Sequence, residues 1–195
     1  DEAKWPTWKH WMGTDSLGRD LLARVLIGMR ISLSVGIVAS LINLTVGVIY
    51  GGISGYFGGK VDNFMMRFVD IIDSIPTMLY VILLMVVMNS YDQTIFTLPV
   101  FSVFKGLGTS LISIFIALGL TFWINMARIV RSEILSLKER EYVTAARALG
   151  ASHMSILFKH LLPNCIGTII VVTMLQIPTA IFTESFLSFI GLGVA

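Results

Sequence analysis

Long apolar blocks separated by polar segments dominate this chain. Four blocks contain no charged residue, and they run over residues 31–59, 74–91, 106–127 and 161–183. Each block approaches or exceeds the roughly 20 apolar residues that a helix needs to cross a hydrocarbon core about 30 Å thick. The pattern predicts four membrane-spanning helices.

The polar segment between the third and fourth blocks has the composition of a helical hairpin. Residues 133–149 are mostly good helix formers, and Gly150 offers the left-handed conformation that ends a helix. Ser152 can cap a second helix that lies along the membrane interface. The apolar residues that fall on one face of this second helix are Met154, Leu157, Phe158 and Leu161.

The segment before the first block is amphipathic. Thr14, Asp15 or Ser16 can cap a helix whose apolar stripe lies opposite Asp20 and Arg24. We expect this helix to lie flat on the outer surface. The chain then divides into an extracellular amphipathic segment, residues 1–30, and a transmembrane domain, residues 31–195.

Composition supports the membrane assignment. Hydrophobic residues make up 55% of the chain and charged residues 13%, and the mean hydropathy of +0.84 is far too high for a soluble domain. The predicted fold class is therefore an all-α integral membrane protein, a polytopic helical bundle. A single cysteine, Cys165, excludes an intrachain disulfide.

Glycine spacing predicts close helix packing in the first span. Gly47, Gly51, Gly55 and Gly59 recur every four residues, which leaves one flat helix face that another helix can approach closely. The partner helix belongs either to a second copy of the chain, or to the same subunit or a different chain.

Polar residues inside the blocks each have two interpretations. Asn43, Asn125 and Gln176 either line a pathway or form hydrogen bonds with neighbouring helices. Glu184, at the outer end of the last span, is either a gate or substrate contact or a helix-end carboxylate near solvent. The sequence does not choose between these roles.

Three charged residues, Arg67, Asp70 and Asp73, lie at the start of the second span. They form either ion pairs or a proton relay. Relays require carboxylates deeper in a span, so we expect structural ion pairs; the centres of the predicted spans are uncharged.

No catalytic or nucleotide site is visible. The segment around Lys60 has the glycines of a phosphate-binding loop but not its spacing or its Ser or Thr after the lysine. His10, His153 and His160 are too scattered for a metal site, and no serine has a paired histidine and acid. We expect a protein that is not an enzyme, with no cofactor or metal of its own and no nucleic-acid partner.

The segment from Glu141 to Pro163 carries the most specific signal. It reads Thr144-Ala145-Ala146, three residues, Gly150, nine residues, His160, one residue, then Leu162-Pro163. This spacing resembles the signature of ABC-importer permeases, with departures at Thr144 and His160.

Two other segments resemble the dipeptide, oligopeptide and nickel permeases of that family. Gly-Thr-Asp followed by Leu-Gly-Arg-Asp occupies residues 13–20, and residues 51–76 carry the pattern of Gly-Tyr, Gly-Gly, Asp, Arg, Asp and Pro. The resemblance implies the type I ABC-importer permease fold, with six spans and both termini in the cytoplasm. This chain would then lack the first and last spans and begin and end outside.

The resemblance also implies the partners. Two homologous permeases enclose a pathway, two ATPases that hold ATP and Mg bind cytoplasmic hairpins, and an external binding protein delivers the substrate. The hairpin here covers about residues 131–160. The residues matching the docking signature are Glu141, Thr144, Ala145, Ala146, Arg147, Gly150, His160, Leu162 and Pro163.

Orientation and location follow the same reasoning. Basic residues between 128 and 159 and between 60 and 67 place these two loops on one side, the cytoplasmic side of a bacterial or archaeal membrane. The N-terminal helix then lies outside, where it either positions the first span or receives the binding protein.

Alternatives remain open at this point. A self-sufficient homo-oligomeric channel or ion-coupled carrier would need no docked ATPase but would carry ionisable residues inside its spans. For an importer we expect an oligopeptide substrate first and a dipeptide next, and then a nickel chelate or another small solute. Residues 89–108, with Tyr91, Phe96, Phe101 and Phe104, form either a lid or partner contact outside the membrane or a loop packed on the interface.

Overall fold

The computed structural model describes residues 5–90 and 108–191, and every regular element in these ranges is helical. Apart from the helices, the described backbone contains one isolated bridge, between Thr14 and Asp20. The elements are α1 (Leu21–Ile42), η1 (Asn43–Gly47), α2 (Val48–Phe57), α3 (Gly59–Asp73), α4 (Thr77–Ser90), α7 (Gly108–Thr121), α8 (Trp123–Leu137), α9 (Glu141–Ala148), α10 (His153–Ser155), η2 (Ile156–Leu161), η3 (Leu162–Cys165) and α11 (Ile166–Phe189).

The first span is longer than predicted. Helices α1, η1 and α2 join into one helix of 37 residues, Leu21–Phe57. The prediction of a separate surface helix before residue 31 is wrong, because no proline or left-handed residue interrupts the helix between Leu21 and Phe57. The helix is capped by Asp20, whose Oδ1 accepts hydrogen bonds from the backbone N–H groups of Leu22 and Ala23.

Three helices in the described part of the chain are long and apolar enough to cross a membrane, and a bent pair makes up to four. The bent pair joins α3 to α4 at 70°. The four predicted spans are reached when this pair counts as one span, because α4, in the predicted second block, has only 14 residues by itself. The third span extends past its predicted end at residue 127, because α7 and α8 form one helix over Ile112–Leu137.

Two arginines, Arg128 and Arg131, therefore lie inside a spanning helix. The predicted block 106–127 itself carries no charge, and both arginines lie on the extension of its helix. The third span tolerates both guanidinium groups because carboxylates from α3 pair with them.

Glycine packing brings α2 against α8. A Cβ on Gly51 would stand 2.3 Å from the carbonyl oxygen of Ala127, and one on Gly55 would stand 2.7 Å from that of Arg131. Gly47 is equally close to Met126. The glycine face is thus used within the subunit.

Gly59 does not belong to this face, which corrects the prediction. Gly58 and Gly59 have φ angles of 63° and 54°, so the chain reverses after Phe57 and Gly59 opens α3. A Cβ at Gly59 would meet nothing within 4 Å.

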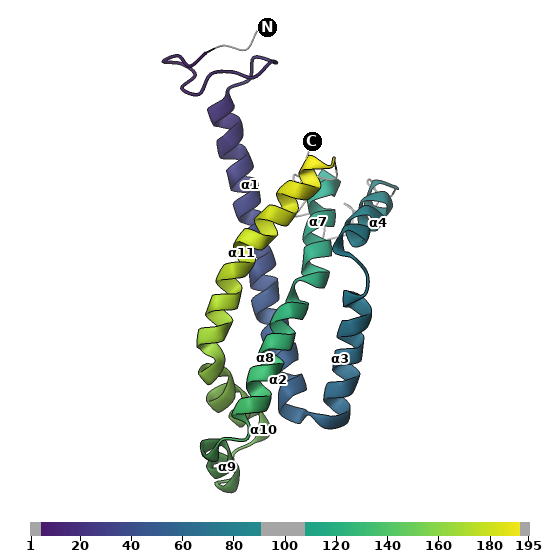
Figure 1. The fold of residues 1–195 in the computed structure, drawn as a ribbon, viewed down its shortest axis with the longest axis vertical. Helices are drawn as coiled ribbons and strands as arrows, with labels where there is room; N and C mark the ends of the chain where they lie inside the picture. The colour runs from purple at the N-terminus through teal and green to yellow at the C-terminus, as the bar shows by residue number, and fades with distance from the viewer. Residues whose placement is uncertain (1–4, 91–107, 192–195) are drawn as a thin grey trace.

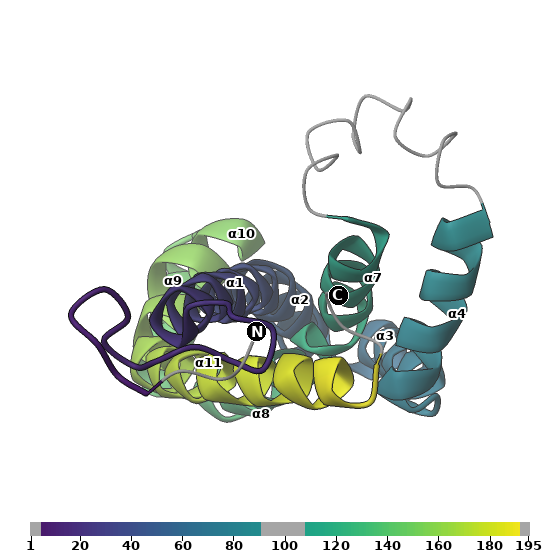
Figure 2. The ribbon, with the colours of Figure 1, turned by 90° about the horizontal axis from the view of Figure 1, so that it is seen from above.

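The spans run between two ends of the molecule. The turn after α2 and the hairpin of α9 and α10 lie at one end, and the described N- and C-terminal residues lie towards the other (Figure 1). Seen along the spans, α4 lies beside α7 at one edge, away from the paired α1 and α11 (Figure 2). The two loops predicted to share a side do so.

The predicted lid or partner loop with Tyr91, Phe96, Phe101 and Phe104 lies outside the described residues, apart from the helix ends that flank it. Three buried clusters hold the described helices together. One surrounds the base of the hairpin, one lies where α1, α7 and α11 meet, and a small one surrounds Trp123.

Candidate functional site

Three residues separate the end of α8 from α9, the first helix of the hairpin, and the chain turns at Gly150. The φ angle of Gly150 is 82°. Its N–H donates to the carbonyl of Arg147 over 3.0 Å, and the N–H of Ala151 donates to the carbonyl of Ala146 over 3.1 Å. These two bonds make a Schellman motif, so the predicted left-handed stop is confirmed.

The second limb of the hairpin starts as predicted and then departs from an α-helix. The side chain of Ser152 accepts a hydrogen bond from the N–H of Ser155, which confirms the predicted cap. From Ile156 to Leu161 the backbone is a π-helix, followed by a short 3-10 helix.

The predicted apolar stripe of the second limb divides by burial. The buried residues of this limb are Ile156, Leu157 and Leu161, whereas Met154 and Phe158 are about half exposed. The π-helical turn begins at Ile156, so it shifts Phe158 around the axis relative to a turn of 3.6 residues, whereas Met154 precedes it in α10. The predicted apolar stripe thus divides into the buried Leu157 and Leu161 and the half-exposed Met154 and Phe158.

Buried contacts fix the hairpin to the spans. Val143 of α9 has no exposed surface and packs with the buried side chains of the second limb and with Tyr56 at the end of α2. The Tyr56 hydroxyl lies 2.8 Å from His153 Nδ1, and Lys138 Nζ donates to the carbonyl of Gly55 over 3.1 Å. The sequence did not predict these links, because their partners are 97 and 83 residues apart along the chain.

The predicted coupling residues divide by exposure. Ala146 is half-buried against the core, as are His160 and Leu162 at the base of the second limb. Leu162 and Pro163 line an apolar groove of about 360 Å³ beside the first span. The predicted coupling residues exposed to solvent are Glu141, Thr144, Ala145, Arg147, Gly150 and Pro163.

Between the hairpin and the middle of the bundle, Asp62 of α3 joins α8 through Arg131. Arg131 Nη2 donates to Asp62 Oδ2 over 2.6 Å, and Arg131 Nε donates to Asp62 Oδ1. Ser54 of α2 donates to the same Oδ1 over 2.5 Å. The Asp62 side chain is only 9% exposed, so three helices meet at one satisfied carboxylate.

A second cluster joins the same two helices further along. Arg128 donates through Nη1 to Asp73 over 2.8 Å and through Nη2 to Asp70 over 3.1 Å. The three side chains are between 44% and 55% exposed. The predicted ion pairing of Asp70 and Asp73 is confirmed, but their partner is Arg128 rather than Arg67.

The exposed cluster borders a cavity of about 530 Å³. Two of the predicted pathway residues, Asn125 and Gln176, lie on its wall. Its lining residues are Asp73, Thr121, Phe122, Ile124, Asn125, Arg128, Ile129, Val172, Leu175, Gln176 and Thr179.

The other two predicted pathway residues lie elsewhere. Asn43 is fully buried in the π-helical turn of the first span, where its side chain has no hydrogen-bond partner among the described residues. Glu184 is 5% exposed and accepts hydrogen bonds from Ser32 over 2.8 Å and from Ser188 over 2.9 Å. It is thus a buried link between α1 and α11 rather than a solvent-facing helix end.

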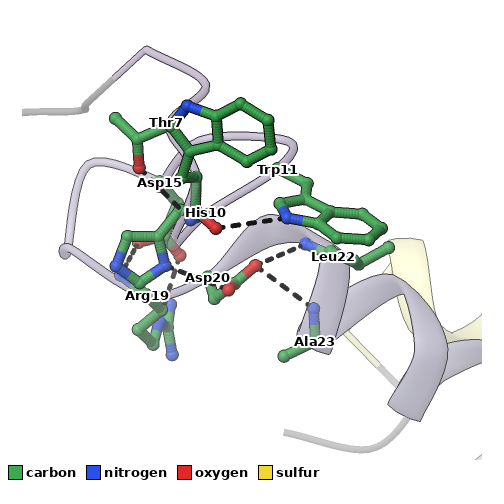
Figure 3. A network of polar contacts seen from close by, with 9 residues as sticks. Thr7, His10, Trp11, Asp15, Arg19, Asp20, Leu22 and Ala23 are labelled. Carbon is green, nitrogen blue, oxygen red and sulfur yellow. Dashed lines mark hydrogen bonds and ion pairs between the residues drawn. The ribbon is translucent and has the colours of Figure 1, made fainter.

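At the other end of the first span, a polar network orders the N-terminal loop (Figure 3). His10 Nδ1 lies 3.0 Å from Asp20 Oδ2, and Asp15 pairs with Arg19 and Arg24. The backbone N–H of Arg19, followed by that of Leu17 and the Arg19 side chain, lowers the pKa of Asp15 to about 2. Hydrogen bonding to His10 lowers the pKa of Asp20.

Within residues 5–90 and 108–191, no group of three His, Cys, Asp or Glu side chains is arranged to hold a metal ion. Cys165 is buried and donates to the carbonyl of Leu161. Arg128 and Arg131 pair with carboxylates of another helix.

Comparison with known proteins gives the family. Residues 44–195 match the family model described as the binding-protein-dependent transport system inner membrane component. The chain is 50% identical over 189 residues to the oligopeptide transport system permease protein OppC of Bacillus subtilis, covering 97% of this chain and 56% of that protein. It is 48% identical over 189 residues to the dipeptide transport system permease protein DppC of Bacillus subtilis, covering 97% and 53%.

The OppC protein of Escherichia coli K12 is 47% identical over 184 residues, covering 94% of this chain and 55% of that protein. The chain thus spans about half the length of the curated relatives it matches. The chain has the fold of type I ABC permeases. It is a multi-pass protein of the bacterial cytoplasmic membrane. This chain belongs to the family of binding-protein-dependent transport system inner membrane components.

Proposed function

We propose that this chain forms half of the membrane pathway of an ATP-driven peptide importer. The similarity to permeases named for oligopeptide and dipeptide transport supports the substrate class. The observation that carries the coupling role is the hairpin, which exposes one surface at one end of the molecule and is fastened to two spans behind it.

The hairpin is suited to transmit movement. An ATPase that binds the exposed face of α9 pushes on Val143 and the second limb, which pack in the same buried cluster as Tyr56 and Ile134 of the spans. Close-packed interiors transmit displacement because they have few voids to absorb it. Movement of the hairpin therefore shifts α2 and α8 together.

The partners follow from this role. Two ATPase subunits carry ATP and Mg and bind the hairpins of this chain and of a second, homologous permease. An external binding protein delivers the peptide at the opposite end. In this arrangement the hairpin faces the cytoplasm and the N-terminal loop faces outside.

One observation favours the rival function of an ion-coupled carrier, because Arg128 and Arg131 lie inside a spanning helix. Both arginines are paired with carboxylates, and the glycine face is occupied by α8 rather than by a second copy. The importer is therefore the better proposal.

Site-directed crosslinking tests it. Leu149, which is 88% exposed beside Gly150, is changed to Cys in the full-length protein, with Leu17, 68% exposed in the N-terminal loop, as the matched control. We expect Leu149→Cys to crosslink to an ATPase subunit and Leu17→Cys not to do so; the native Cys165 is buried. Absence of an ATPase adduct at the hairpin would contradict the coupling role, and purification as a homo-oligomer without ATPase would favour the carrier.

A further inference from the structure

The cavity between α3, α8 and α11 contains groups that match a peptide. Its two charged lining residues are Asp73 and Arg128, and its two amides are Asn125 and Gln176. Its volume of about 530 Å³ falls in the range of cavities that hold small ligands. It lies against α8, which is part of a membrane-spanning helix.

The charge of the cluster favours a cation. Two carboxylates share one guanidinium, so Asp70, Asp73 and Arg128 together carry a formal charge of −1. Asp73 bonds Arg128 only through Oδ2, and its Oδ1 has no hydrogen-bond partner among the described residues. Asp70 does not line the cavity, so Asp73 is the carboxylate that a ligand meets.

The two amide side chains of the cavity match the peptide groups of a ligand. Asn125 is exposed and Gln176 is half-buried, and neither side chain has a hydrogen-bond partner in the described part of the chain. An amide side chain both donates and accepts, as a peptide group does. The apolar remainder of the wall, including Phe122 and Leu175, accepts side chains without selecting among them.

We propose that this cavity is a transit site for peptides, in which Asp73 Oδ1 binds the α-ammonium group and Asn125 and Gln176 bind the adjoining peptide groups. Arg128 is a positioning residue that fixes the Asp73 carboxylate. The inference rests on the proposed function of peptide import. Exposed ion pairs are weak, so the ligand does not have to break a strong bond to enter.

The experiment uses the complete transporter, with its partner permease, ATPases and binding protein, in proteoliposomes. Initial uptake is measured for one labelled pentapeptide with a free amino terminus and for its N-acetylated form, each at a concentration that saturates the binding protein. Wild type is compared with Asp73→Asn and with the matched control Asp70→Asn, which alters the same cluster away from the cavity.

We expect wild type and Asp70→Asn to prefer the free amine. Asp73→Asn should lower uptake of the free amine about tenfold, leave that of the acetylated peptide unchanged, and so remove the preference. A preference retained in Asp73→Asn, or an equal loss for both peptides with normal assembly, would overturn the transit site while peptide import stands. If wild type imports neither peptide, the proposed function itself fails.

Discussion

Two charged clusters join α3 to α8, and they differ in how far water reaches them. In one, Asp62 is 9% exposed and is bonded by Arg131 and Ser54. In the other, Arg128 bonds Asp70 and Asp73, and all three side chains are about half exposed beside a cavity. The same residue types on the same two helices therefore form one buried and one exposed cluster.

The difference has an energetic basis. Removing one partner of a buried pair leaves an uncompensated charge and destabilises by about 3–5 kcal/mol. An exposed pair contributes about 0–1 kcal/mol, because water solvates both groups when they part. The buried cluster holds the helices together, and the exposed one contributes little to their stability.

The largest effect should follow from breaking the buried cluster. Arg131→Ala leaves the Asp62 carboxylate with Ser54 alone, and we expect a loss of about 3–5 kcal/mol in the free energy of unfolding, measured by denaturant titration in detergent. The double variant Asp62→Leu, Arg131→Met should recover most of that stability. A single variant as stable as wild type would contradict the structural role of this pair.

A glycine substitution should loosen the same cluster from another side. Gly51→Ala places a Cβ 2.3 Å from the carbonyl of Ala127 and forces α2 away from α8, which draws Ser54 away from Asp62. We expect a loss of about 1–3 kcal/mol, the usual effect of overpacking. Gly28→Ala, where a Cβ meets nothing within 4 Å, is the control and should fold as wild type does. Equal stability of the two variants would mean that α2 and α8 are not in close contact.

The hairpin variant tests whether an intact buried cluster is sufficient for transport. Gly150→Val places a branched side chain at φ 82°, which strains the turn by about 1–2 kcal/mol. We expect normal amounts of protein in the membrane but at least tenfold slower peptide uptake, measured in cells. Gly167→Ala, at a helical glycine with open space, should transport normally. Undiminished uptake by Gly150→Val would show that the hairpin does not couple.

Arg128→Gln should have the smallest effect on stability. We expect a change below about 1 kcal/mol, since this pair is exposed to the cavity. Uptake of peptides with a free amino terminus should nevertheless fall, because Asp73 loses the group that positions it. A stability loss as large as that of Arg131→Ala would remove the distinction between the clusters.

An acid titration tests the polar network of the N-terminal loop. The pKa of Asp15 in the folded loop is about 2, below its usual value of 3.8, so its contribution to loop stability is complete above about pH 4 and is lost as pH falls through 2. We expect protease resistance of residues 5–20 to be constant from pH 7 to pH 4. Loss of resistance already at pH 5 would contradict the Asp15 network.

Local chemistry predicted the parts of the fold that depend on neighbouring residues. The stop at Gly150, the cap at Ser152 and the glycine face of the first span each depend on residues within a few positions. The pairing of Arg131 with Asp62 was missed because 69 residues separate them, and only the packed helices bring them together.

The sequence also failed to predict the length of the first helix and the π-helical turn of the hairpin. The sequence before residue 31 is amphipathic, but nothing in it ends a helix, so α1 continues into the span. The π-helical turn of the hairpin has no reliable sequence signal, and it altered which apolar side chains are buried.

The length of the first helix has a mechanical consequence. At 1.5 Å per residue, its 37 residues form a rod about 55 Å long, well beyond a hydrocarbon core of about 30 Å. One end carries the N-terminal loop, and the other carries Tyr56, which contacts His153 of the hairpin. A tilt of about 10° would displace one end by about 10 Å relative to the other, so a movement of the hairpin at Tyr56 would be carried to the N-terminal loop.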